Sequence, residues 1–151
     1  MKIKKSQTAD TRTCDISKVT KEQLLKSSKN HISDVRQGMQ FLINEMKFAS
    51  RNHDHTKIEN IDEFYSDFKS DFKKQGWWKM HQKVERHHFN NPKYIQKDVN
   101  LIDVLEQIVD GCMAGMARSG EYRKEVPDME LLQKAYDNTA KMLLKNIKVI
   151  E

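Results

Sequence analysis

The chain has 151 residues, enough for one domain with a sizeable hydrophobic core. Hydrophobic residues make up 37% of the chain and charged residues 32%, with five glycines and two prolines, a composition that excludes a disordered chain and favours long helices. The formal net charge of +5 comes from interspersed lysines and acids, so it indicates no specific nucleic-acid binding, and no apolar run is long enough to span a membrane.

Residues 1–19 are polar and lack periodicity, and we predict a flexible N-terminal arm there. The basic start of the chain is followed by no apolar segment, so we expect no secretory signal. Cys14 and Cys112 show no CxxC spacing, which is typical of a reduced compartment. We therefore expect a cytoplasmic protein.

Residues 20–151 are predicted to form one all-α domain, a bundle of about five main helices. Thr20 is a suitable N-cap for the first helix and Asn100 for the fourth, and Pro127 suits the first turn of the fifth. Apolar residues step by three and four along each helix, as a buried face requires. The predicted ranges are 20–49, 61–72, 77–88, 100–119 and 127–147.

The segment Arg51–Lys57 places His53 directly before Asp54, which pairs a nitrogen ligand with an anionic oxygen ligand. Further candidate ligands lie on other predicted elements, so that several can converge on one divalent metal ion. The full set is His31, His53, Asp54, His81, His87, His88 and Asp110. Imidazoles mixed with carboxylates suit Mn, Fe, Co, Ni or Zn better than Ca or Mg. If Asp54 bridges, the set can hold two ions, and such a pair activates a water and clamps a phosphoryl oxygen.

The order His31, His53-Asp54, Asp110 resembles the HD-domain superfamily of metal-dependent phosphohydrolases, an all-α fold. The sequence is more closely similar to a small branch of that superfamily found in phages and bacteria. The residues that carry this likeness are His53–Lys57, Glu63–Tyr65, Trp78–His81 and His87-His88. The resemblance covers about residues 31–120. Two departures stand out, because Thr56 replaces the usual Ser and Phe89–Pro92 replaces a Pro-acid step.

The resemblance implies that His31, His53, Asp54 and Asp110 hold the first metal ion. It further implies that His81 and one of His87 and His88 hold a second ion or contact phosphate. Lys57, Arg51 and Arg86 are the candidate phosphate-binding residues. Glu106, one turn before Asp110, can hydrogen-bond a ligand histidine. With a metal-bound hydroxide as nucleophile, Asp54 and Glu106 are the candidate catalytic acids.

Other interpretations of these residues remain open. His31 borders an apolar stripe and can be a core-edge histidine, His55 can be a solvent-facing turn residue, and one of His87 and His88 can lie on the surface.

Three functions compete. The first is a phosphohydrolase acting on a nucleotide or other small phosphate ester, in the cytoplasm of a bacterial or phage-infected cell. The second is a di-iron oxygenase of the same fold. The third is a phage-like accessory protein that keeps the fold but uses no metal. A homodimer paired through the fifth helix is compatible with each.

Overall fold

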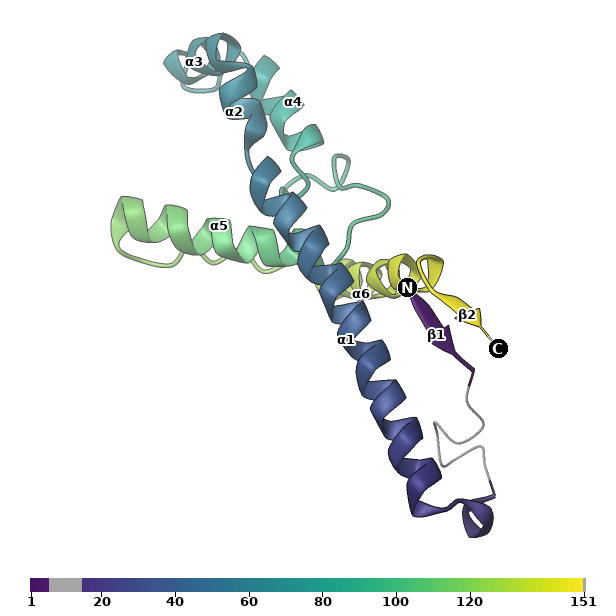
Figure 1. The fold of residues 1–151 in the computed structure, drawn as a ribbon. Helices are drawn as coiled ribbons and strands as arrows, with labels where there is room; N and C mark the ends of the chain where they lie inside the picture. Colours follow the sequence, from purple (N-terminus) through teal and green to yellow (C-terminus); the bar gives the residue numbers. More distant parts are fainter. Residues whose placement is uncertain (6–14, 151) are drawn as a thin grey trace. The chain divides into compact units, whose positions relative to one another are not determined.

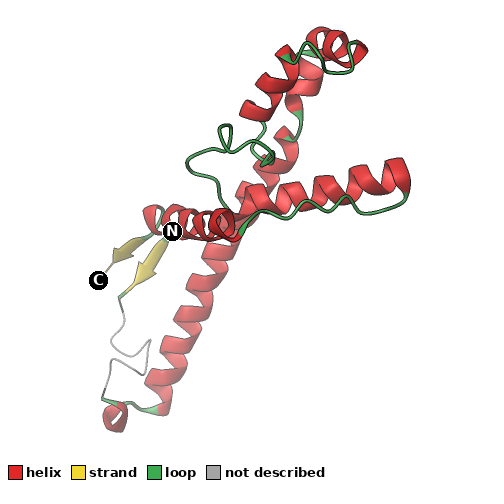
Figure 2. Cartoon of the chain, turned by 180° about the vertical axis from the view of Figure 1, so that it is seen from behind, coloured by secondary structure: helices red, strands yellow, loops and turns green. Residues whose placement is uncertain are grey.

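The computed structural model describes residues 1–5 and 15–150, and helices dominate these residues (Figures 1 and 2). The α-helices are α1 (Lys21–Asn52), α2 (His55–Glu59), α3 (Ile61–Lys69), α4 (Gly76–Val84), α5 (Leu101–Ser119) and α6 (Met129–Lys145). A 3-10 helix covers Ile16–Lys18, and two short strands are β1 (Lys2–Lys4) and β2 (Lys148–Ile150). The all-α prediction is confirmed. Within the described ranges, no helix combines the length and the apolar character needed to cross a membrane.

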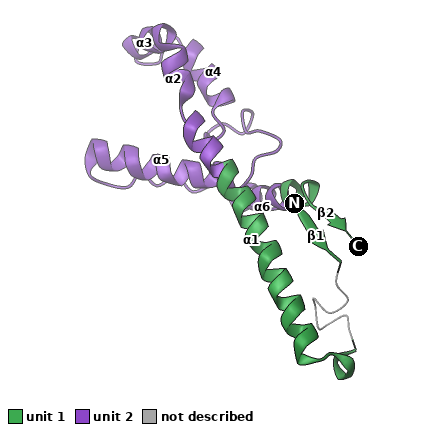
Figure 3. Cartoon of the chain, viewed as in Figure 1, with its two compact units in different colours: residues 1–45, 141–151 green, residues 46–140 purple. Residues whose placement is uncertain are grey.

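Two compact units make up the chain (Figure 3). Unit 1 comprises residues 1–45 and 141–151, and unit 2 comprises residues 46–140. The division cuts α1 and α6, so each of these helices contributes to both units. This differs from the predicted organisation, which separated an arm at residues 1–19 from one domain.

In unit 1, the first residues of the chain form a strand instead of belonging wholly to a flexible arm. β1 pairs in parallel with β2, with Ile3 opposite Val149. The pairing continues at both ends, where the Lys148 amide donates to Met1 O (2.9 Å) and the Lys5 amide donates to Ile150 O (2.9 Å). Strands of three residues are too short to show alternation in a sequence. The rest of the predicted arm at residues 6–14, with Cys14, lies outside the described residues.

Helix α1 begins as predicted at Thr20. The Gln23 amide donates to Thr20 Oγ1 (3.2 Å) and the Thr20 amide donates to Gln23 Oε1 (2.9 Å), which makes a reciprocal capping box. Most of the apolar stripe predicted to be buried is instead exposed, as Leu25 and Met39 are 53% and 55% accessible. The other described elements of unit 1 are two strands, one 3-10 turn and the end of α6, too little structure to cover a long helix.

In unit 2, α2, α3 and α4 pack around aromatic rings. Phe64 of α3 stacks on Trp77 of α4 with ring centroids 4.1 Å apart. The turn between these helices is held by the buried carboxylate of Asp67, which accepts hydrogen bonds from the amides of Gln75 (2.8 Å) and Trp78 (3.0 Å). The start of α4 is therefore fixed by a charged hydrogen-bond acceptor.

Helix α5 begins at the predicted N-cap Asn100, whose side chain accepts from the Ile102 amide (2.8 Å) while its own amide donates to Asp103 (2.9 Å). The Leu101 amide donates to Thr139 Oγ1 of α6 (2.9 Å), which joins the two helices within unit 2. After α5, the chain returns along the helix, and the Arg123 amide donates to Gly111 O (3.3 Å).

Candidate metal centre

The His53-Asp54 pair lies in the link between α1 and α2. Helix α1 ends at Asn52, and Asp54 adopts a left-handed backbone conformation with φ 55° and ψ 23°. Aspartate tolerates this region better than most residues, because its short polar side chain can hydrogen-bond locally. The turn places the Asp54 carboxylate in the interior of unit 2, with 15% of its side chain exposed.

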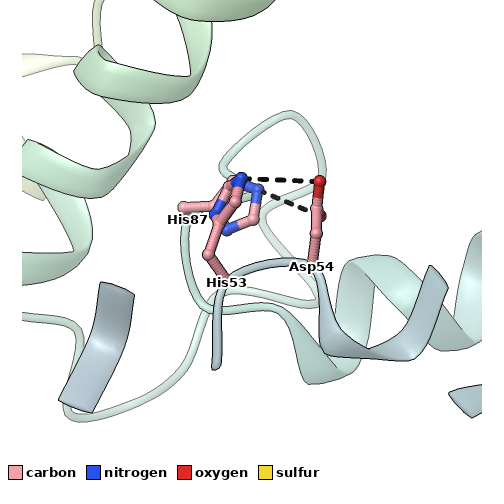
Figure 4. Close-up of side chains that lie close together, drawn as sticks. All are labelled: His53, Asp54 and His87. Carbon is pink, nitrogen blue, oxygen red and sulfur yellow. Dashed lines mark ion pairs between the residues drawn. The ribbon is translucent and has the colours of Figure 1, made fainter. Parts of the chain in front are cut away.

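Three imidazoles point their Nε2 atoms at this carboxylate. His53 Nε2 lies 3.5 Å from Asp54 Oδ2, and His87 Nε2 lies 3.7 Å from Asp54 Oδ1 (Figure 4). His81 Nε2 lies 3.4 Å from Asp54 Oδ1. His88 completes the cluster, since its Nε2 lies 2.8 Å from His81 Nε2. The four histidines thus surround one aspartate.

The cluster divides into two groups whose ligand atoms are close enough to share a metal ion. One group is His53, Asp54 and His87, and the other is Asp54, His81 and His88. Asp54 belongs to both, so its carboxylate is placed to bridge a pair of ions. Nitrogen-rich groups of this kind can bind a transition metal ion.

The opposite nitrogen is hydrogen-bonded in two of these histidines and lies beside a carboxylate in a third. His53 Nδ1 is hydrogen-bonded to Glu106 Oε1 (2.8 Å), and His87 Nδ1 lies 3.1 Å from the same oxygen, as an ion-pair contact outside hydrogen-bonding geometry. His81 Nδ1 is hydrogen-bonded to Thr56 Oγ1 (2.7 Å). Metal-ligating histidines are oriented in this way by a partner on the other ring nitrogen.

Two facing atoms of the cluster lack hydrogen bonds although they are buried. Among the described residues, neither Asp54 Oδ1 nor His87 Nε2 has a hydrogen-bond partner. An unpaired buried polar atom is costly, and a shared cation would satisfy both atoms at once. The donor set and these unpaired atoms therefore fit a bound metal ion.

The surroundings set different charge states for the histidines. Burial, followed by the charge of His88, lowers the pKa of His81 to about 3. Burial, followed by the charge of His87, lowers the pKa of His88 to about 4. For His87, burial acts to lower the pKa. The effect of the nearby acids Glu106, Asp54 and Asp110 is larger, so the pKa of His87 is raised. His81 and His88 are thus neutral at neutral pH, the form that binds metals.

Nearby charges also keep the acids of the site ionised. Burial opposes ionisation of Asp54, but the hydrogen bond and charge of Lys57 lower its pKa, with help from His53 and His87. Burial likewise opposes ionisation of Glu106, and contacts with His87 and His53 lower its pKa.

The remaining predicted ligands, Asp110 and His31, belong to neither of the two groups. Asp110 stands next to them, with Oδ1 3.7 Å from His53 Nε2. His31 belongs to unit 1, has an exposed side chain and precedes His53 by about six helical turns. The structure therefore brings Asp110 close to the predicted centre, whereas His31 is in neither group of possible ligands. His87 and His88 lie after α4, which ends at Val84 and not at residue 88. Outside a helix, adjacent histidines can both face one centre.

The predicted phosphate-binding residues have separate surroundings. Lys57 contacts the Asp54 carboxylate from α2, and Arg51 is exposed in the last turn of α1. Arg86 binds Asp103 through two hydrogen bonds of 2.8 and 2.9 Å and also contacts Asp98 (3.1 Å). Its guanidinium is thus engaged in holding the start of α5, which argues against the predicted phosphate contact.

A pocket of about 430 Å³ opens beside the histidines. Phe64, Trp77 and Trp78 contribute to an aromatic wall, and His81, His88 and Asp110 also line the pocket. Lys57, Arg118 and Arg123 bring positive charge to its lining. Sequence reasoning missed both arginines, and also Thr56 and Glu85, because their roles depend on contacts between distant parts of the chain.

Comparisons with known proteins found no matching family model, no matching curated protein and no matching solved structure.

Proposed function

We propose that the chain is a metal-dependent phosphohydrolase that acts on a nucleotide or other small phosphate ester. The observation that carries the proposal is the shared position of Asp54 in two groups of possible ligands. The HD-domain resemblance of the sequence points the same way. When bound, the ions would supply an activated water and a clamp for a phosphoryl oxygen.

The residues divide the work as follows. His53, Asp54 and His87 would hold one ion, and Asp54, His81 and His88 the other. Glu106 orients His53. Asp110 lines the pocket and can accept the proton of an attacking water.

The pocket supports a phosphate ester with an attached planar group. Lys57, Arg118 and Arg123 are placed to bind phosphate oxygens. The rings of Phe64 and Trp77 offer a surface for a base.

The first experiment is the metal content of protein purified without chelator, alongside Asp54→Asn. The asparagine keeps the shape of the side chain and tolerates a left-handed backbone, so the variant removes mainly the bridging charge. Asp71→Asn is the matched control, because Asp71 also has a left-handed backbone (φ 57°) and is not part of either group.

We expect one or two transition-metal ions per chain in the wild type and in Asp71→Asn, and most of the metal lost in Asp54→Asn. Phosphate release from a panel of nucleotides and from p-nitrophenyl phosphate should follow the same order. Absence of metal in the wild type after reconstitution with Mn, Fe, Co, Ni and Zn would overturn the proposal and favour a metal-free binding protein.

A di-iron oxygenase is the second candidate, and the observation that favours it is the histidine-rich donor set around Asp54. Iron content after aerobic purification, with oxygen uptake and no phosphate release, would support it over the hydrolase.

A further inference from the structure

Three buried side chains form a continuous hydrogen-bonded chain behind the candidate metal centre. Thr56 is 3% exposed, His81 is 0% exposed and Glu85 is 4% exposed. Thr56 lies between the other two, with its Oγ1 2.7 Å from His81 Nδ1 and 2.6 Å from Glu85 Oε1. Glu85 and Thr56 belong to neither group of possible ligands.

The hydrogen bonds among Glu85, Thr56 and His81 can point in only one direction. An ionised carboxylate accepts and does not donate, so Glu85 Oε1 accepts both the Thr56 amide (3.0 Å) and the Thr56 hydroxyl (2.6 Å). The hydroxyl has a single hydrogen, which is directed at Glu85. Thr56 Oγ1 is therefore left to accept the Nδ1–H of His81.

This arrangement fixes which nitrogen of His81 is free. With the hydrogen on Nδ1, the lone pair is on Nε2, which faces Asp54 Oδ1 (3.4 Å) and His88 Nε2 (2.8 Å). Trp77 stacks on the His81 ring (centroids 4.5 Å apart) and its Nε1 donates to Thr56 O (3.4 Å). The ring is thus held both along its edge and on its face.

We propose that Thr56 and Glu85 are positioning residues that hold His81 as the Nδ1–H tautomer and so present its Nε2 to a metal ion at Asp54, His81 and His88. The metal part of this inference rests on the proposed function. The tautomer does not, because it is a property of the protein without metal.

The first test is the tautomer itself, measured by ¹⁵N NMR of the histidine side chains in metal-free protein at neutral pH. We expect His81 to carry its hydrogen on Nδ1 in the wild type and in Thr56→Ser, which keeps the hydroxyl. In Thr56→Val the acceptor is gone, so the Nε2–H form should appear. Thr139→Val is the matched control, because Thr139 is also buried (8% exposed) and its hydroxyl, like that of Thr56, accepts from one N–H group and donates to one oxygen, here the Leu101 amide and Ala135 O.

The second test is Zn²⁺ affinity of the same four proteins. Loss of a partner behind a ligand histidine typically weakens metal binding about 10–100-fold. In Thr56→Val we expect Zn²⁺ affinity to be weakened to this extent for one of the two ions. In Thr56→Ser and in Thr139→Val we expect the affinity of the wild type.

The outcomes separate the two proposals. An Nε2–H tautomer of His81 in the wild type, or a tautomer unchanged in folded Thr56→Val, would overturn the positioning role. A wild type that shows the Thr56-dependent tautomer but binds no metal would support the hydrogen-bonded chain and overturn the proposed function.

Discussion

The lowered pKa values of His81 and His88 make the stability of the folded protein depend on pH. Their pKa values of about 3 and 4 lie below the ordinary 6.5, so below pH 6.5 the unfolded chain binds protons that the folded protein does not. Their stabilising effect is complete above pH 6.5 and is lost as the pH falls toward 4. For His88 alone the loss amounts to about 3 kcal/mol.

We therefore expect the free energy of unfolding of metal-free protein to fall steeply between pH 6.5 and 4.5, measured by urea titration with circular dichroism. Asp54 and Glu106 begin to lose their own contribution only below about pH 4.5, so this window reports the histidines. The variant His88→Gln should show a shallower decline. An equal decline in both proteins would contradict the lowered pKa of His88.

Arg86 and Arg118 both lie near the site, but we predict different roles for them, in stability for Arg86 and in substrate binding for Arg118. Replacing Arg86 by Met leaves the buried Asp103 carboxylate without its bidentate partner, so we expect a loss of about 3 kcal/mol in the free energy of unfolding. Its effect on KM for p-nitrophenyl phosphate should be small. The variant Arg118→Met should keep stability and raise KM about tenfold. A raised KM in Arg86→Met at unchanged stability would restore the original sequence-based interpretation.

At the scale of elements, α5 and the chain that follows it fit together through two glycines. A Cβ on Gly115 would stand 2.3 Å from Glu121 O and 2.7 Å from the Arg123 amide, and one on Gly111 would stand 2.7 Å from Arg123 O. These are backbone atoms, so the returning segment must move to admit a methyl group. Arg123 lines the pocket, and the close packing therefore positions a charge of the site.

We expect Gly115→Ala to lower the free energy of unfolding by about 1–3 kcal/mol and to raise KM for phosphate esters. The matched control is Gly38→Ala, a helical glycine of α1 whose Cβ would meet nothing within 4 Å. That change should stabilise the protein by about 0.5–1 kcal/mol, because alanine favours a helix. Thermal unfolding and steady-state kinetics of both variants check the pair, and equal effects would contradict the tight packing.

The sequence predicted elements best where the signal is local. Thr20 and Asn100 carry their capping partners three residues away, so both helix starts were correct. The third predicted helix was too long, because the chain leaves the helix at Val84 and brings Glu85 to Thr56, a contact that no local pattern encodes.

The same distinction holds for the site. The His53-Asp54 pair and the later histidines could be recognised from residue type and order. The contact of Arg86 with Asp103 could not be predicted, because the two residues are seventeen positions apart and a charge looks the same in a sequence whether it meets substrate or a buried acid.

At the scale of the whole molecule, the first and last described segments are held together in unit 1. Deleting residues 1–5 removes Met1 O, which accepts from the Lys148 amide, and the whole of β1. We expect hydrogen exchange at Lys148 to accelerate in the truncated protein. The Val104 amide, bonded to Asn100 O at the start of α5, should exchange unchanged as an internal control. Unaltered exchange at Lys148 would show that β2 does not depend on β1.

The positive net charge of the chain contrasts with the carboxylates beside the candidate metal centre. The formal net charge is +5, yet Asp54, Glu106 and Asp110 gather around the histidines. A phosphate dianion is attracted to the molecule but repelled by these carboxylates until cations neutralise them. For the proposed hydrolase we therefore expect metal to bind before substrate, so that vanadate or free phosphate should bind the metal-loaded protein and not the chelator-treated one.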